Sequence, residues 1–180
     1  EAASLYQIEL DLKRTFPEHA EFRSARGRAR LRRVLRAFVR RVPATGYTQS
    51  LNFLAAFLLL QIPERGGIRN SAQVDREEAT FWLLCCVVER LLPDYYTSRL
   101  TGLQADTRVL EALVAQHPTL HRVGANLERL GLSLSLVSTQ WLMLGFIGIL
   151  PTETPLRAWE LLLPLGPRAL LAAALAAMRR

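Results

Sequence analysis

The sequence predicts an all-α fold built from many helices. Apolar residues recur at three- and four-residue steps along almost the whole chain, and this spacing places one face of a helix against a core. No segment convincingly alternates apolar and polar residues over the length of a strand. The chain has 180 residues, of which 50% are hydrophobic. Such a chain has enough apolar material for one compact core, so we expect a single domain over residues 1–180.

Two helices are expected before residue 43. The first covers about Leu5 to Arg14 and ends at the turn of residues 15–17, because Pro17 disfavours helical geometry in the residue before it. The second ends at Pro43 and has arginines largely on its opposite face. Its apolar stripe consists of Leu31, Val34, Leu35, Phe38, Val39 and Val42.

Two more helices are expected between residues 48 and 91. One runs from about Thr48 to Ile62 and is followed by a polar loop at 63–67 without a core pattern. The other starts at Asp75, because Glu78 three residues later completes a pattern like a capping box. It continues to Leu91, and Pro93 closes it.

In the second half of the chain, the sequence predicts five further helices, separated by proline and glycine. They cover residues 106–116, 119–130, 133–149, 153–163 and 167–178. Residues 132–150 carry no charge and approach the length of a membrane span. Serine, threonine and glutamine make the first half of this stretch polar, and Gly145 and Gly148 loosen the second half. These residues favour a buried helix.

The net charge of +7 comes almost entirely from arginine, because Lys13 is the only lysine. Arginine suits contacts with phosphate and carboxylate, so nucleotide, acidic protein and anionic membrane partners all stay open. The arginines between Arg23 and Arg41 are one candidate nucleic-acid surface. They lie opposite a full apolar stripe and lack interleaved aromatic residues. This pattern favours an ordinary solvated face, and we expect no nucleic-acid partner.

Common catalytic, nucleotide and metal signatures are missing. The sequence has no phosphate-binding Gly-rich loop with Lys-Ser/Thr and no nucleophile elbow. His117 and His121 lie four residues apart, but no third zinc ligand accompanies them. Cys85 and Cys86 are adjacent in an apolar helical stretch and are interpreted as core thiols. No secretory signal begins the sequence, which favours a cytosolic setting.

Two short segments carry candidate chemistry. In the first, steps of three residues put Ile8, Asp11 and Arg14 near one side of a helix. Asp11 can then hold an arginine that projects from the end of the helix. The plain alternative is a common surface ion pair.

The second segment covers residues 46–53. A turn at Gly46 precedes a very apolar helix, and polar Gln49 and Asn52 are expected in its exposed first turn. The plain alternative is ordinary polarity at a helix N-terminus. Spacing alone does not decide between the two interpretations.

In this order, the two segments resemble the signature motifs of the TBC family of Rab GTPase-activating proteins. Ile8-x-x-Asp11-x-x-Arg14 with Thr15-Phe16-Pro17 resembles the first motif, and Tyr47-x-Gln49 resembles the second. Further stretches at 78–82, 92–96 and 141–160 resemble other family blocks, so the resemblance covers nearly the whole chain.

The resemblance implies a helical domain that supplies two catalytic side chains to a partner enzyme. Arg14 is implied to stabilise the transition state and Gln49 to orient the attacking water. Asp11 is implied to position Arg14 and Tyr47 to shape the contact. Four further residues are implied to support the site or bind the partner, and these are Ile8, Thr15, Ser50 and Asn52.

The implied partner is a GTP-bound Rab-type small GTPase in vesicle traffic. The domain is implied to be no enzyme itself and to need no cofactor of its own, because GTP and Mg²⁺ belong to the GTPase. The implied location is the cytoplasm, peripherally associated with endomembranes through the partner.

Three departures from the family pattern leave an alternative open. Ser50 stands where many members have glycine, and Glu160 follows Trp159 where aspartate is usual. The sequence also begins just before the first motif, so we expect a TBC-type domain that is incomplete at one or both ends. The alternative function is a catalytically silent TBC-fold scaffold that binds a small GTPase or a membrane adaptor.

Overall fold

The computed structural model describes residues 2–63 and 75–179. These residues form helices and no strand, which confirms the predicted all-α class. Their contacts divide the chain into two compact units, Glu1–Arg90 and Leu91–Arg180. The single domain over 1–180 stays a prediction. Most of the polar loop expected at 63–67 lies outside the described residues.

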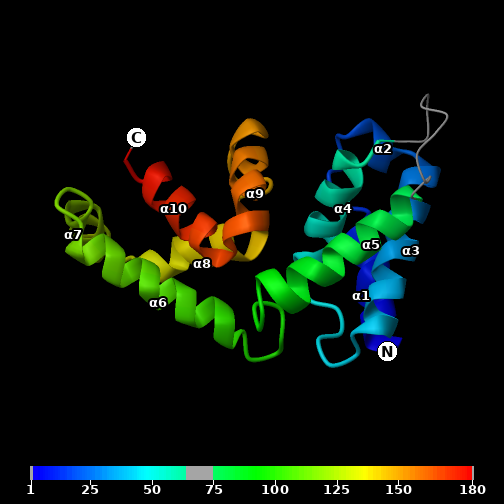
Figure 1. Cartoon of the computed structure of the whole chain (residues 1–180), viewed down its shortest axis with the longest axis horizontal. Coiled ribbons are helices and arrows are strands. Elements are labelled where there is room, and N and C mark those ends of the chain that lie inside the picture. The colour runs from blue at the N-terminus through cyan, green and yellow to red at the C-terminus, as the bar shows by residue number, and fades with distance from the viewer. Residues whose placement is uncertain (1, 64–74, 180) are drawn as a thin grey trace. The chain divides into compact units, whose positions relative to one another are not determined.

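The first unit is organised around one long helix, α3 (Figure 1). Helix α3 packs against the four other α-helices of the unit, and α4 also packs against α5. The apolar stripe predicted for α3, from Leu31 to Val42, is buried. The elements are α1 (Ala2–Leu12), α2 (Ala20–Arg23), α3 (Ala25–Arg41), α4 (Leu51–Gln61), α5 (Arg76–Cys86) and the π-helical turn η1 (Val87–Leu91).

Helix α2 was not predicted, because four residues are too short to show a helical period. It is held by its ends and by close packing on α3. The His19 side chain accepts a hydrogen bond from the Glu21 amide (3.2 Å), and Ser24 caps α3 through the Gly27 amide (2.9 Å). A Cβ atom at Gly27 would lie 2.0 Å from the Glu21 carbonyl oxygen. Glycine at position 27 is therefore required for this close approach.

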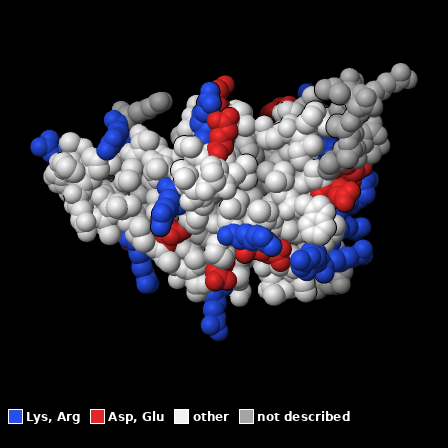
Figure 2. All heavy atoms as spheres, in the orientation of Figure 1, with Lys and Arg blue, Asp and Glu red and all other residues white. Residues whose placement is uncertain are grey.

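The arginines of α3 bind glutamates on neighbouring elements. Arg32 donates to Glu9 of α1 (2.7 Å), and this hydrogen bond lowers the pKa of Glu9. Arg33 pairs with Glu77 of α5 (2.6 Å), and Arg30 with Glu21 of α2 (3.1 Å). On the face in Figure 2, basic side chains often lie beside acidic ones. The arginine face is therefore largely exposed to solvent, as expected from the sequence, and it also forms interhelical ion pairs.

The second unit contains all five predicted helices with shifted ends. Helix α6 begins at Thr101, five residues before its predicted start, and packs against α7, α8 and α10 (Figure 1). Helices α9 and α10 pack against each other. The bounds are α6 (Thr101–Gln116), α7 (His121–Arg129), α8 (Leu134–Leu144), α9 (Glu153–Leu165) and α10 (Pro167–Ala177).

Helix α8 is shorter than the predicted 133–149. It ends at Leu144 because Gly145 adopts a left-handed conformation with φ 52°. The indole nitrogen of Trp159 also donates to the Gly145 carbonyl oxygen (3.0 Å), which fixes this bend. Among the helices that the structure describes, none has the length and apolar character needed to cross a bilayer.

Candidate functional site

Arg14 lies in a turn directly after α1. The helix ends at Leu12, so the prediction that Arg14 belongs to the last helical turn is wrong. The Asp11 carbonyl oxygen accepts hydrogen bonds from the Arg14 amide (3.1 Å) and from the Thr15 hydroxyl (2.7 Å). These two donors satisfy a carbonyl group that the helix leaves unpaired at its end. The turn therefore gives Arg14 a defined backbone position.

The Asp11 carboxylate is fully buried and holds the Arg14 side chain. Its Oδ1 atom lies 2.5 Å from Nη2 of Arg14 and accepts a hydrogen bond from Nε2 of Gln7 (3.0 Å). Its Oδ2 atom accepts from the Tyr47 hydroxyl (2.7 Å). The Arg14 side chain is 50% exposed. One end of the guanidinium is thus held by a buried anion while half of the side chain faces solvent.

Tyr47 is a neutral donor to this anion. Burial raises the pKa of the Tyr47 phenol well above its ordinary value, and the hydrogen bond to Asp11 raises it further. The phenol therefore stays protonated around neutral pH and donates to Asp11. Tyr47 can make this contact with Asp11 because the backbone turns at Gly46. Gly46 has φ 64° and lies close to Ser4 of α1.

Gln49 lies in the loop before α4. The helix begins at Leu51 and not near Thr48, so the prediction that Gln49 lies in its first turn is wrong. The reason is Ser50, whose φ of 109° interrupts helical geometry. Gln49 is exposed, and its side chain forms no hydrogen bond with any residue in the described ranges. It is therefore available to a partner.

A buried hydrogen-bond chain joins the Arg14 turn to the Gln49 loop. The Asn52 side chain accepts from the Ser50 amide (3.2 Å) and donates to the Thr15 hydroxyl (2.7 Å). Thr15 in turn donates to the Asp11 carbonyl, and both Asn52 and Thr15 are fully buried. Phe16 also packs edge-on against Phe53 with ring centroids 5.4 Å apart. These polar and aromatic contacts hold the two loops together.

The comparison with known proteins identifies the family. A family model described as the Rab-GTPase-TBC domain matches residues 1–180. The chain belongs to this family. Its TBC domain contains the two motif-bearing segments that the hydrogen bond between Asn52 and Thr15 joins.

Relatives in sequence and structure support this membership. Growth hormone-regulated TBC protein 1 of Homo sapiens is 38% identical over 176 residues, which are 96% of this chain and 48% of that protein. TBC1 domain family member 2A of Homo sapiens is 39% identical over 173 residues, covering 94% of this chain and 17% of that protein. The chain therefore spans about half the length of the first relative.

Two solved structures resemble the TBC domain. The crystal structure of the Chlamydomonas flagellar RabGAP TBC domain matches with a TM-score of 0.81 at 32% identity, over 97% of this chain and 54% of that one. The Ypt/Rab-GAP domain of Gyp1p matches with a TM-score of 0.69 at 23% identity, over 88% of this chain and 53% of that one. The fold is therefore the TBC fold that the resemblance implied.

The structure divides the eight expected site residues of the TBC domain into two groups. Arg14 and Gln49 are exposed, and Tyr47 is half-buried. The other five are buried and support the site from within the unit, so they do not form its outer surface. They are Ile8, Asp11, Thr15, Ser50 and Asn52. Gln7, which contacts Asp11, was missed, although its spacing of four residues from Asp11 is a signal for such a contact.

The hydrogen-bond chain between the loops is expected to contribute to the stability of the TBC domain. Thr15→Val keeps the shape of the side chain but leaves the Asn52 amide without its acceptor and removes one donor from the Asp11 carbonyl. We expect the free energy of unfolding to fall by about 2–3 kcal/mol, measured by urea denaturation. Thr15→Ser keeps the hydroxyl and serves as the control. Equal losses of unfolding free energy in Thr15→Val and Thr15→Ser would contradict the contribution of these hydrogen bonds.

Ser50 carries backbone strain that glycine would relieve. Its φ of 109° is rare for a residue with a Cβ atom, and a conformation of this kind costs on the order of 1–3 kcal/mol. Glycine offsets part of the relief because the unfolded chain gains freedom, by roughly 0.5–1 kcal/mol. We therefore expect Ser50→Gly to raise the melting temperature by ~2–4 °C. Ser50→Ala retains the Cβ atom and should give no such rise, so a lower melting temperature for glycine than for alanine would refute the argument.

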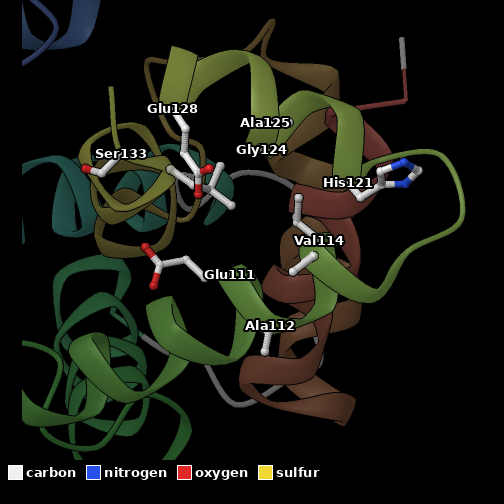
Figure 3. A pocket seen from close by; sticks show the side chains of 10 residues that line it. Glu111, Ala112, Val114, His121, Gly124, Ala125, Glu128 and Ser133 are labelled. Atoms are coloured by element: carbon white, nitrogen blue, oxygen red, sulfur yellow. The ribbon is translucent and has the colours of Figure 1, made fainter. Parts of the chain in front are cut away.

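The second unit contains a cavity separate from these residues. It has a volume of about 620 Å³ and is lined by α6, α7 and the start of α8. Glu111 and Glu128 extend toward each other across it, whereas His121 points away from them (Figure 3). The His117 ring accepts backbone hydrogen bonds from Thr119 (3.2 Å) and Leu120 (3.3 Å). The His117 ring therefore stabilises the turn before α7, and His121 lines the cavity without pointing toward the two glutamates.

Proposed function

We propose that this TBC domain accelerates GTP hydrolysis by a Rab-family GTPase, supplying Arg14 and Gln49 in trans. The observation that carries the proposal is the pairing of two exposed polar side chains on loops that Thr15 and Asn52 join by a buried hydrogen bond of 2.7 Å. The family membership and the match to a solved RabGAP TBC domain support it.

Arg14 has the chemistry that phosphoryl transfer requires. In the transition state, negative charge spreads over the oxygens of the γ-phosphate, and a positive group placed there lowers the barrier. Arg14 presents a guanidinium that is always charged, with several nitrogen donors in a planar group. The contact with Asp11 uses one of these nitrogens, Nη2. The remaining donors are left for phosphate oxygens, and Asp11 sets the direction from which they approach.

Gln49 supports the second half of the proposal. An attacking water needs an acceptor and a donor that hold it in line with the bond to be broken. A glutamine amide offers both groups on one side chain. In this proposal Gln49 takes the place of the GTPase's own water-orienting glutamine.

The partner supplies everything else in the reaction. GTP and Mg²⁺ are bound by the GTPase, and the TBC domain needs no cofactor of its own. The proposed partner is the GTP-bound form, because the γ-phosphate is what Arg14 recognises. We further propose that the domain acts in the cytoplasm in vesicle traffic, and that it reaches endomembranes through a membrane-attached GTPase.

The test is GTP hydrolysis by a panel of GTP-loaded Rab proteins, followed as phosphate release in single turnovers. We expect at least one Rab to hydrolyse GTP faster in proportion to the concentration of the chain. No stimulation of any Rab, with binding retained, would favour the scaffold alternative. The scaffold alternative rests on Ser50. This residue lies next to Gln49, is only 7% exposed and has a strained backbone conformation.

A further inference from the structure

We propose that Gln7 is a positioning residue for Arg14, acting through the buried carboxylate of Asp11. This inference rests on the proposed function, because it concerns how Arg14 reaches the phosphate. Gln7 belongs to neither of the two motifs. It lies one helical turn before Asp11 in α1, and its side-chain nitrogen donates to Oδ1 of Asp11 at 3.0 Å.

The first step of the argument is the sharing of one oxygen atom. Oδ1 of Asp11 receives both Gln7 and Arg14, at 3.0 Å and 2.5 Å. Oδ2 receives Tyr47 at 2.7 Å. Gln7 and Tyr47 therefore bind one carboxylate oxygen each and fix the rotation of the carboxylate without help from Arg14. The direction of the guanidinium is then set by an oxygen whose place Gln7 determines.

The second step concerns the charge that Arg14 leaves behind. When the guanidinium turns toward a phosphate, its contact with Asp11 weakens. Asp11 is fully buried, and a buried carboxylate without partners is strongly unfavourable. The hydrogen bonds from Gln7 and Tyr47 keep both oxygens occupied. Without Gln7, Oδ1 would depend on Arg14 alone, and the guanidinium would be held back from the phosphate.

Both effects act in the same direction on the rate. Loss of the Gln7 donor frees the carboxylate to rotate, which displaces the resting guanidinium, and it also strengthens the hold of Asp11 on that guanidinium. Small displacements of a catalytic group lower rates by up to about 10². Binding of the GTPase should change little, because Gln7 is only partly exposed and its side-chain nitrogen faces the buried Asp11 carboxylate.

The experiment compares Gln7→Leu with the unchanged chain in stimulated GTP hydrolysis. Leucine has a similar volume and no donor. We expect kcat to fall about tenfold while KM for the GTPase stays within about twofold. Gln7→Glu should lower kcat further, because a second carboxylate beside Asp11 competes for Arg14. The control is Glu9→Gln, which weakens the contact between α1 and Arg32 of α3 without touching Asp11.

A second measurement checks the hydrogen bond without activity. As a single substitution, Gln7→Leu should lower the melting temperature by about 2–4 °C. In an Asp11→Leu background, where the hydrogen-bond acceptor is gone, the same substitution should lower the melting temperature much less. Equal shifts in both backgrounds would overturn the assigned contact. Unchanged kcat in Gln7→Leu, or an equal loss in Glu9→Gln, would overturn the positioning role while the proposed function stands. If the unchanged chain stimulates no Rab, the proposed function itself fails, and the role of Gln7 fails with it.

Discussion

Arg14→Ala is expected to lower the stimulated rate of GTP hydrolysis by about 10³ or more. The reason is that the substitution removes the positive charge proposed to face the γ-phosphate, and arginine residues in this role contribute about 10³ to 10⁵ in rate. The loss should fall on kcat, because the charge is needed most in the transition state. The measurement is phosphate release in single turnovers with saturating TBC domain.

Two comparisons separate this role from a loss of fold. Arg14 is the charged partner of buried Asp11, so Arg14→Ala is also expected to lower stability. Arg14→Lys keeps the charge and should recover a part of the stability while recovering little activity, because lysine lacks the planar set of donors. Lys13→Ala removes an exposed charge next to Arg14 and should leave kcat unchanged. A kcat loss in Lys13→Ala equal to that in Arg14→Ala would contradict a specific role for Arg14.

Gln49→Ala is expected to lower the stimulated rate by about 10² or more, the cost of removing one group that stabilises a transition state. Gln49 is exposed in the loop before α4, so its truncation should leave the melting temperature nearly unchanged. The measurement is the same single-turnover hydrolysis together with a thermal melt. Full stimulation by Gln49→Ala would rule out its role in orienting water.

The GTPase provides a matched test of Gln49. If Gln49 orients the water, a Rab whose own water-orienting glutamine is replaced should still respond to the unchanged TBC domain. The same Rab should not respond to Gln49→Ala. A Rab that becomes insensitive to the unchanged domain after losing its own glutamine would show that Gln49 does not take its place.

The all-α class and the buried stripe of α3 were predictable because helical periodicity is a local property of the sequence. The stripe from Leu31 to Val42 repeats at three- and four-residue steps, and all of its members are buried. The ends of the elements were harder. Helix α2 has four residues and is set by packing of Gly27 on Glu21, and the start of α4 is set by the conformation of Ser50. Neither the contact of Gly27 with Glu21 nor the conformation of Ser50 produces a periodic pattern in the sequence.

The family motifs indicated the site residues, whereas only the structure shows how these residues are arranged. Spacing of three residues correctly brought Asp11 and Arg14 together. It did not indicate that Tyr47, 36 residues later, donates to the same carboxylate, or that Asn52 reaches Thr15 across 37 residues. The sequence favoured a solvated face for the arginines of α3 and did not indicate the ion pairs that they form. Their glutamate partners lie on four other elements, and only the tertiary fold brings them together.

The measurement that tests the central proposal most directly is complex formation between the TBC domain and a GDP-loaded Rab in the presence of aluminium fluoride. This anion takes the place of the transferring phosphate and imitates its transition state. We expect a complex that requires the fluoride and is lost in both Arg14→Ala and Gln49→Ala. Binding that is equally tight without fluoride, with GDP or GTP, and in both variants would contradict the proposal and establish the domain as a scaffold.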